Sequence, residues 1–127
     1  MSKILIIEDE VILLSIITDK LRNEGYEVEV ATNGEEGLKK AKETNPDLIL
    51  LDLVMPKMNG FEFIAVLKED PDVGNTPIIV LSNSGYAVEI EKLKVLGVED
   101  YLVKANFSPQ EVMEKVARHL EPSKSTE

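Results

Sequence analysis

Residues 48–56 read LILLDLVMP, and the rest of the chain is arranged around them. The apolar run from Leu48 to Leu51 lies between Asp47 and Asp52, a pattern that predicts a strand buried on both faces. Asp52 therefore places a carboxylate at the end of a buried strand. A charge in that position is costly unless a cation or hydrogen-bond donors pair with it, so the residues that surround Asp52 decide the chemistry.

The composition is that of one globular domain. The chain has 127 residues, of which 43% are hydrophobic and 30% charged. We assign residues 1–121 to the domain and residues 122–127 to a short polar tail. No apolar run approaches the roughly 18–20 residues of a membrane span. The start of the chain has no signal-peptide layout, and there is no cysteine, so a cytoplasmic protein is expected. The net charge of −10 repels nucleic-acid phosphates, which argues against nucleic-acid binding by this domain alone.

Further apolar runs predict four more strands. Residues 4–7 and 78–81 are continuously apolar, residues 26–30 alternate with glutamates, and residues 100–103 form a short run. Segments with helical features separate these strands: 11–24, 33–44, 60–69, 87–96 and 108–120. This (βα)5 order predicts a single doubly wound α/β domain, flavodoxin-like, with a parallel five-stranded sheet. The continuous runs belong in the middle of the sheet and the others at its edges, which gives the strand order 2-1-3-4-5.

Polar side chains follow four of the five predicted strands. Glu8 and Asp9 come after the first strand, Asp52 after the third, Ser82 after the fourth and Lys104 after the fifth. Each has an ordinary explanation taken singly: an acid at a helix start, a turn cap, a loop serine, a solvated lysine. In the predicted topology, however, all of them meet at the carboxyl edge of one sheet. The ordinary explanations give no reason for this convergence.

The residue types at this edge suit one ligand set. Three carboxylates without histidine or cysteine form a hard oxygen site of the kind that Mg²⁺ prefers. Asp52 is also a candidate nucleophile, because a carboxylate can accept a phosphoryl group as an aspartyl phosphate. Mg²⁺ and Lys104 would neutralise the charge that develops on the phosphoryl group, and the Ser82 hydroxyl could then bond one of its oxygens.

The chain resembles the receiver domain of bacterial two-component response regulators, the CheY-like superfamily. The matching text is ILIIEDE at residues 4–10, LLDLVMPKMNG at 50–60, IVLS at 79–82 and GVEDYLVK at 97–104. The resemblance implies a role for each matched site residue. Asp52 is implied as the phosphoacceptor, Glu8 and Asp9 as the acidic pair for Mg²⁺, Ser82 as the switch hydroxyl, Lys104 as the phosphate-contacting lysine and Tyr101 as the aromatic switch residue.

The same resemblance implies a phosphorylation-activated signalling switch rather than an enzyme. The phosphoryl donor would be a sensor histidine kinase, a histidine phosphotransfer protein or a small acyl phosphate. The output would come from docking a downstream protein, usually at the fourth helix, fifth strand and fifth helix.

Some positions depart from the commonest family pattern. Asn83 stands where a small residue is expected, and it either crowds the phosphoryl group or offers it a further hydrogen bond. Ala105 stands where the family has a proline after a cis peptide. A cis bond before alanine costs about 2.5–4 kcal/mol, so the bond is either strained or trans. Val54 and its companion Ser84 occupy positions that, in the family this chain resembles, help to set the lifetime of the phosphorylated form.

Two other side chains have alternative interpretations. Tyr101 is either an aromatic residue packed at a sheet edge or a ring whose burial changes when Ser82 moves. His119, the only histidine, is interpreted as a solvated or helix-dipole residue near the end of the last helix rather than as a phosphotransfer site.

Three other functions compete with the switch. A phosphatase with an aspartyl nucleophile usually has a second aspartate two residues later, and here that residue is Val54. A nucleotide-binding protein would carry a phosphate-binding glycine motif, and neither G-x-x-x-x-G-K-[ST] nor G-x-G-x-x-G occurs. A pseudo-receiver, acting as a constitutive protein-interaction module, remains the alternative function.

Overall fold

Strands and helices alternate along the chain without exception. The computed structural model describes residues 2–53, 58–82, 87–98, 100–103 and 108–120. The strands are β1 (Lys3–Ile7), β2 (Glu27–Ala31), β3 (Leu48–Asp52), β4 (Ile78–Ser82) and β5 (Asp100–Val103). The helices are α1 (Val11–Asn23), α2 (Gly34–Thr44), α3 (Gly60–Lys68), α4 (Ala87–Val95) and α5 (Pro109–Leu120). None of the helices in the described ranges is long and apolar enough to cross a membrane.

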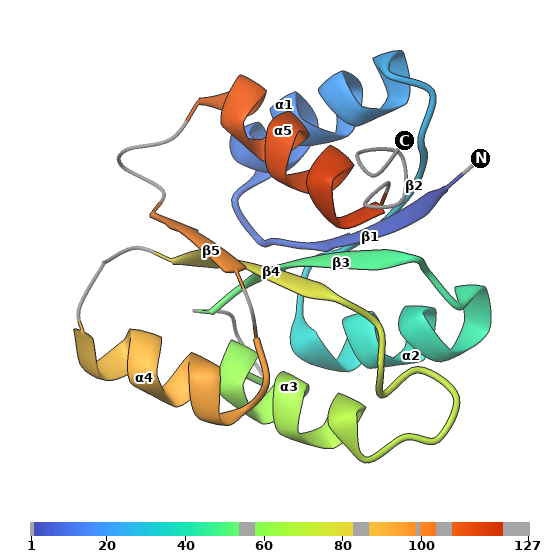
Figure 1. The fold of residues 1–127 in the computed structure, drawn as a ribbon. Helices are drawn as coiled ribbons and strands as arrows, with labels where there is room; N and C mark the ends of the chain where they lie inside the picture. The colour runs from blue at the N-terminus through green and yellow to red at the C-terminus, as the bar shows by residue number, and fades with distance from the viewer. Residues whose placement is uncertain (1, 54–57, 83–86, 99, 104–107, 121–127) are drawn as a thin grey trace, which may run out of the picture.

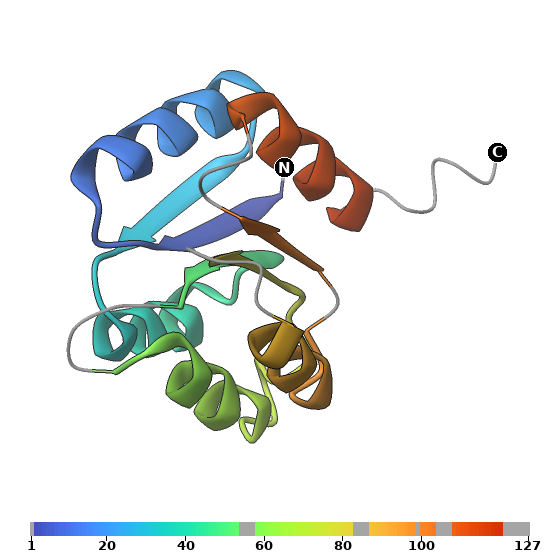
Figure 2. The same cartoon turned by 90° about the vertical axis from the view of Figure 1, so that its left-hand side faces the viewer.

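The strands form one parallel sheet in the order β2-β1-β3-β4-β5. Helices α1 and α5 cover one face, while α2, α3 and α4 cover the other (Figure 1). Figure 2 shows the same three-layer arrangement from the side. The predicted α/β class, strand order and helix placement are therefore confirmed.

Burial separates the central strands from the edges, as predicted. Every residue of β3 and β4 is buried, and β1 is buried from its second residue onward. The edge strands β2 and β5 keep partly exposed positions. Continuous apolar sequence thus marks strands that carry helices on both faces, because both sets of side chains must leave water.

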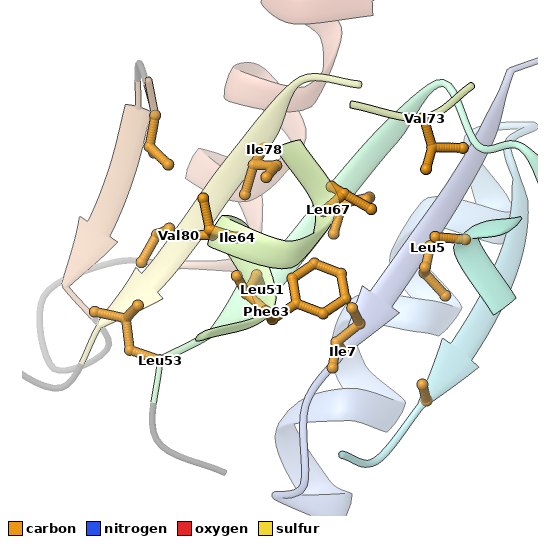
Figure 3. Close-up of a cluster of buried hydrophobic side chains, with 14 of the residues drawn as sticks. Leu5, Ile7, Leu51, Leu53, Phe63, Ile64, Leu67, Val73, Ile78 and Val80 are labelled. Carbon is orange, nitrogen blue, oxygen red and sulfur yellow. The ribbon is translucent and has the colours of Figure 1, made fainter. Parts of the chain in front are cut away.

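Alternate residues of each central strand enter two separate cores. On the side of α2, α3 and α4, side chains such as Leu5, Leu51 and Val80 surround Phe63, which is fully buried (Figure 3). On the side of α1 and α5, the intervening residues pack against Ile17, Leu21, Val112 and Val116 among others. The period-two pleat therefore lets one strand stabilise both layers.

Short polar signals fix where the helices begin and end. Asn59 starts α3 with a reciprocal capping box, in which its side chain accepts from the Glu62 N–H and the Glu62 side chain accepts from the Asn59 N–H. Ser108 and Glu111 make the same exchange at the start of α5. Gly25, at φ 96°, follows α1 in a left-handed conformation that other residues rarely adopt.

Candidate functional site

Three acidic side chains meet at the carboxyl edge of the sheet. Glu8 and Asp9 follow β1, and Asp52 is the last residue of β3, the neighbouring strand. One carboxylate oxygen from each residue lies within 4.8 Å of one from each of the others. Strands β1 and β3 are paired with Ile7 opposite Leu51. The residues that follow this pair, Glu8 and Asp52, therefore lie at the same level of the sheet. The predicted convergence of these three residues is confirmed.

The three carboxylates differ in exposure. Glu8 is fully buried, Asp52 is 2% exposed, and Asp9 is open to solvent. Glu8 is held on two sides, since its N–H donates to the Ala31 carbonyl of β2 at 3.0 Å and its Oε2 accepts from the Glu10 N–H at 3.0 Å. The site is therefore a pocket with two buried acids and one acid at its mouth.

This acidic cluster fits a divalent cation. Like charges at such separations repel, and burial weakens the screening by water. All the ligand atoms that the three residues offer are carboxylate oxygens, the hard donors that Mg²⁺ takes together with water. Glu8, Asp9 and Asp52 could therefore hold such an ion.

Ser82 lies beside this cluster at the end of β4. Its neighbour Leu81 is the register partner of Asp52, and Ser82 itself pairs with Val103, the last residue of β5. Ser82 is 2% exposed. The structure thus brings a buried hydroxyl to the same edge as the carboxylates, one residue beyond the level at which Asp52 ends β3.

Several predictions fall outside the residues that the structure describes. They concern the phosphate-contacting role of Lys104, the isomer of the bond before Ala105, the effects of Asn83, Val54 and Ser84, and the polar tail. These remain predictions.

Gly60 packs against the backbone at the end of β3, next to Asp52, and the sequence alone does not indicate this contact. Its N–H donates to the Leu53 carbonyl at 2.8 Å. A Cβ added at Gly60 would lie 2.7 Å from the Leu53 Cα and 3.0 Å from the Asp52 carbonyl oxygen. Backbone atoms cannot yield as a flexible side chain can, so only glycine allows α3 to begin directly beneath the end of β3. The Asn-Gly pair at 59–60 by itself indicates only the start of a helix.

Tyr101 is half-buried on the edge strand β5 and packs against the core on the α3 and α4 side. This position agrees with packing at a sheet edge, and it leaves part of the ring able to change its burial. The switch role of Tyr101 remains a prediction.

Of the two interpretations of His119, the solvated one is wrong, while its place in the last turn of α5 agrees with the helix-dipole one. Its ring nitrogen Nε2 lies 3.1 Å from Asp100 Oδ2, and its side chain is 18% exposed. Lys115 donates to Asp100 Oδ1 at 2.6 Å, and the Tyr101 N–H donates to the same oxygen at 3.0 Å. The sequence does not indicate this pairing because the partner, Asp100, is distant along the chain and approaches His119 only when α5 packs beside β5.

Asp100 consequently has a lowered pKa. Burial acts to raise the pKa of this carboxyl. The hydrogen bonds from Lys115 and His119, the charge of Lys115 and the Tyr101 N–H outweigh burial and hold the pKa below its ordinary value. A carboxyl whose pKa is lower in the folded than in the unfolded state stabilises the fold above its unfolded pKa of about 3.9. That stability is lost as the pH falls through the folded-state pKa.

We therefore expect Asp100→Asn to lower the free energy of unfolding by about 1 kcal/mol at pH 7. The difference from wild type should shrink as the pH falls below about 4, because Asp100 is then protonated first in the unfolded chain and only at lower pH in the folded protein. Urea unfolding at a series of pH values measures both. The control is Asp72→Asn, since the exposed Asp72 side chain makes no hydrogen bond or ion pair within the described part of the chain. An equal loss at pH 3 and pH 7 would contradict this assignment.

Comparison with known proteins identifies this arrangement. Residues 4–117 match the response regulator receiver domain family. The chain belongs to this family. The strand order and the acidic pocket are both consistent with this family. The chain is a receiver domain of two-component systems rather than a conventional enzyme.

Curated relatives of this receiver domain are longer proteins. The alkaline phosphatase synthesis transcriptional regulatory protein PhoP of Bacillus subtilis is 40% identical over 118 residues, which cover 90% of this chain and 46% of PhoP. The transcriptional regulatory protein ResD of the same organism is 37% identical over 125 residues, covering 98% of this chain and 50% of ResD. The chain spans about half the length of these relatives.

Solved receiver domains have the same fold. The chemotaxis response regulator CheY4 of Vibrio cholerae superposes with a TM-score of 0.88 at 32% identity, covering 94% of this chain and 99% of CheY4. The receiver domain of a sensor histidine kinase from Pseudomonas aeruginosa superposes with a TM-score of 0.84 at 26% identity, covering 94% of this chain and 97% of that one. That structure was determined with a magnesium ion coordinated in the active site cleft.

Proposed function

We propose that this receiver domain, residues 1–121, is a phosphorelay switch that accepts a phosphoryl group on Asp52. The donor is a sensor histidine kinase or a histidine phosphotransfer protein, and the switch acts in the cytoplasm. The observation that carries the proposal is the buried Asp52 carboxylate, which lies within 4.8 Å of Glu8 and Asp9 at the carboxyl edge of the sheet.

The transfer step assigns a role to each residue of the site. An oxygen of Asp52 attacks the phosphorus of a phosphohistidine, forming an O–P bond while the P–N bond breaks and the electron pair returns to the imidazole. Glu8, Asp9 and Asp52 would hold Mg²⁺, which supplies positive charge where the phosphoryl oxygens gather negative charge. Lys104 would contact a phosphoryl oxygen from the other side.

Ser82 and Tyr101 would couple phosphorylation of Asp52 to a change in the docking surface of the domain. Ser82 follows Leu81, the register partner of Asp52, and its hydroxyl would donate a hydrogen bond to a phosphoryl oxygen on Asp52. Tyr101 lies on the neighbouring strand and would follow that movement by changing its burial. The modified state would then favour docking of a downstream protein at α4, β5 and α5 by shifting an existing equilibrium.

Incubation with acetyl phosphate tests the proposal directly. We expect intact-mass measurement to show one phosphoryl adduct when Mg²⁺ is present, and a much smaller amount when a chelator removes the metal. Mg²⁺ alone should also raise the melting temperature, because it binds the folded acidic pocket and not the unfolded chain. A wild-type protein without an adduct would support the pseudo-receiver function instead.

A further inference from the structure

A second cavity lies at the opposite edge of the sheet from the acidic pocket. Its volume is about 430 Å³, and Ile78, the first residue of β4, forms part of its wall. The other lining residues come from separate segments. They are Lys68 at the end of α3, Asn75, Thr76 and Pro77 in the loop before β4, Gly97 in the turn after α4, and Arg118 and His119 in α5. No residue of the acidic pocket takes part.

The charge of this cavity is opposite to that of the whole chain. The net charge is −10, yet the described residues that line the cavity include two cations and a histidine and no acidic residue. The nearby Asp100 is already engaged by Lys115 and His119. Lys68 and Arg118, in contrast, make no hydrogen bond or ion pair within the part of the chain that the structure describes. Their donors are therefore available to a ligand.

Favourable contact with helix ends explains this charge only in part. Cations in a last turn interact well with exposed carbonyls. The carbonyls at the end of α3, however, accept from its own continuing backbone, at 3.2 Å for Glu69 N–H to Val66 and 3.0 Å for Asp70 N–H to Leu67. The end of α4 is closed in the same way, since the Gly97 N–H donates to the Lys94 carbonyl at 3.0 Å. Helix capping therefore does not account for Lys68, whereas Arg118 lies in the last turn of α5, where a cation is favoured.

We propose that this cavity binds a small organic phosphate. A guanidinium presents paired donors that match phosphate oxygens, and an ammonium adds a second positive charge for a dianion. The Asn75 amide and the Thr76 hydroxyl supply polar groups on the same wall, while Pro77 and Ile78 offer an apolar surface to the organic part. The volume lies within the roughly 300–1,000 Å³ of small-molecule sites.

A bound phosphate would tie together segments that are distant in sequence. Lys68 belongs to α3 and Arg118 to α5, which cover opposite faces of the sheet (Figure 1). The site does not depend on phosphorylation of Asp52, so its test and the test of the proposed switch can fail separately.

The test is an NMR titration of the ¹⁵N-labelled protein in metal-free, low-salt buffer. The probes are adenosine 5′-monophosphate, pyrophosphate and citrate. We expect the two phosphate probes to shift the amide signals of Asn75 and Gly97 with saturation, and citrate to bind more weakly. Lys68→Gln and Arg118→Gln should each weaken adenosine monophosphate binding about tenfold or more, because each removes a charge-assisted hydrogen bond. The matched control Lys39→Gln, at an exposed position on α2, should leave binding unchanged.

Four results would overturn the phosphate site: no saturable shift with either phosphate probe, shifts that persist in both variants, shifts confined to the Glu8 and Asp52 edge, or citrate binding more tightly than both phosphates. If a variant does not fold, competition on the wild type replaces it. Pyrophosphate that displaces adenosine monophosphate from the same amides supports the site, and independent binding contradicts it.

Discussion

The variant Asp52→Asn is expected to form no phosphoryl adduct with acetyl phosphate and Mg²⁺. An amide lacks the anionic oxygen that attacks phosphorus, and the other acids of the pocket cannot take its place. Glu8 is fully buried and held by the backbones of β2 and of the α1 start, and Asp9 lies at the exposed mouth. Intact mass measured over a time course gives the adduct fraction, which should fall from a major species to background.

The same substitution is expected to stabilise the metal-free protein. It removes one of three clustered negative charges, two of them buried, and the relief should raise the free energy of unfolding by about 1 kcal/mol or more. Mg²⁺ should stabilise the variant less than the wild type, because one ligand has lost its charge. Urea unfolding with and without Mg²⁺ measures both effects.

Asp19→Asn is the control for this charge change. Asp19 is exposed on α1 and its side chain makes no hydrogen bond or ion pair within the described residues, so its replacement should alter neither adduct formation nor metal-dependent stability. A full adduct on Asp52→Asn, or its loss from Asp19→Asn as well, would contradict the assignment of Asp52.

Gly60→Ala is expected to damage both the fold and the site. The added methyl group would lie 2.7 Å from the Leu53 Cα, so α3 and the end of β3 must separate. Such overpacking costs about 1–3 kcal/mol. Because Asp52 is the residue before Leu53, the shift moves the nucleophile, and a misplacement near 1 Å can slow a reaction by about a hundredfold. We expect a loss of stability in urea and a rate of phosphorylation lower by about tenfold or more.

A second glycine separates the effect on stability from the effect on the site. A Cβ at Gly25 would have no neighbour within 4 Å, but its φ of 96° strains any other residue. Gly25→Ala should therefore cost about 1–2 kcal/mol and leave the phosphorylation rate unchanged, because Gly25 is at the other end of α1 from the acidic pocket. Equal rates for Gly60→Ala and Gly25→Ala would show that Gly60 has no special role at the site.

Much of the fold could be predicted because the signals are local. The continuous apolar runs at 4–7, 48–51 and 78–81 identified the central strands, and the alternation at 26–30 identified an edge strand. Parallel strands then fixed one edge at which Glu8, Asp9, Asp52 and Ser82 had to meet. The family resemblance rests on the same residues and is confirmed over residues 4–117.

The rest depends on contacts between residues that are far apart in the chain. The contact between Asp100 and His119 forms only when α5 packs beside β5. The basic cavity is lined by Lys68 and Arg118, which come from helices on opposite faces of the sheet.

The sequence by itself determined the α/β order, the buried strand that ends at Asp52 and the acids that surround it, because hydrophobic periodicity and strand polarity are written along the chain. Only the tertiary structure decided that Gly60 packs against the backbone beside Asp52, that His119 pairs with Asp100, and that cations line a cavity at the edge of the sheet opposite the acidic pocket. Those features are set by packing distances between elements, which no spacing along the sequence specifies.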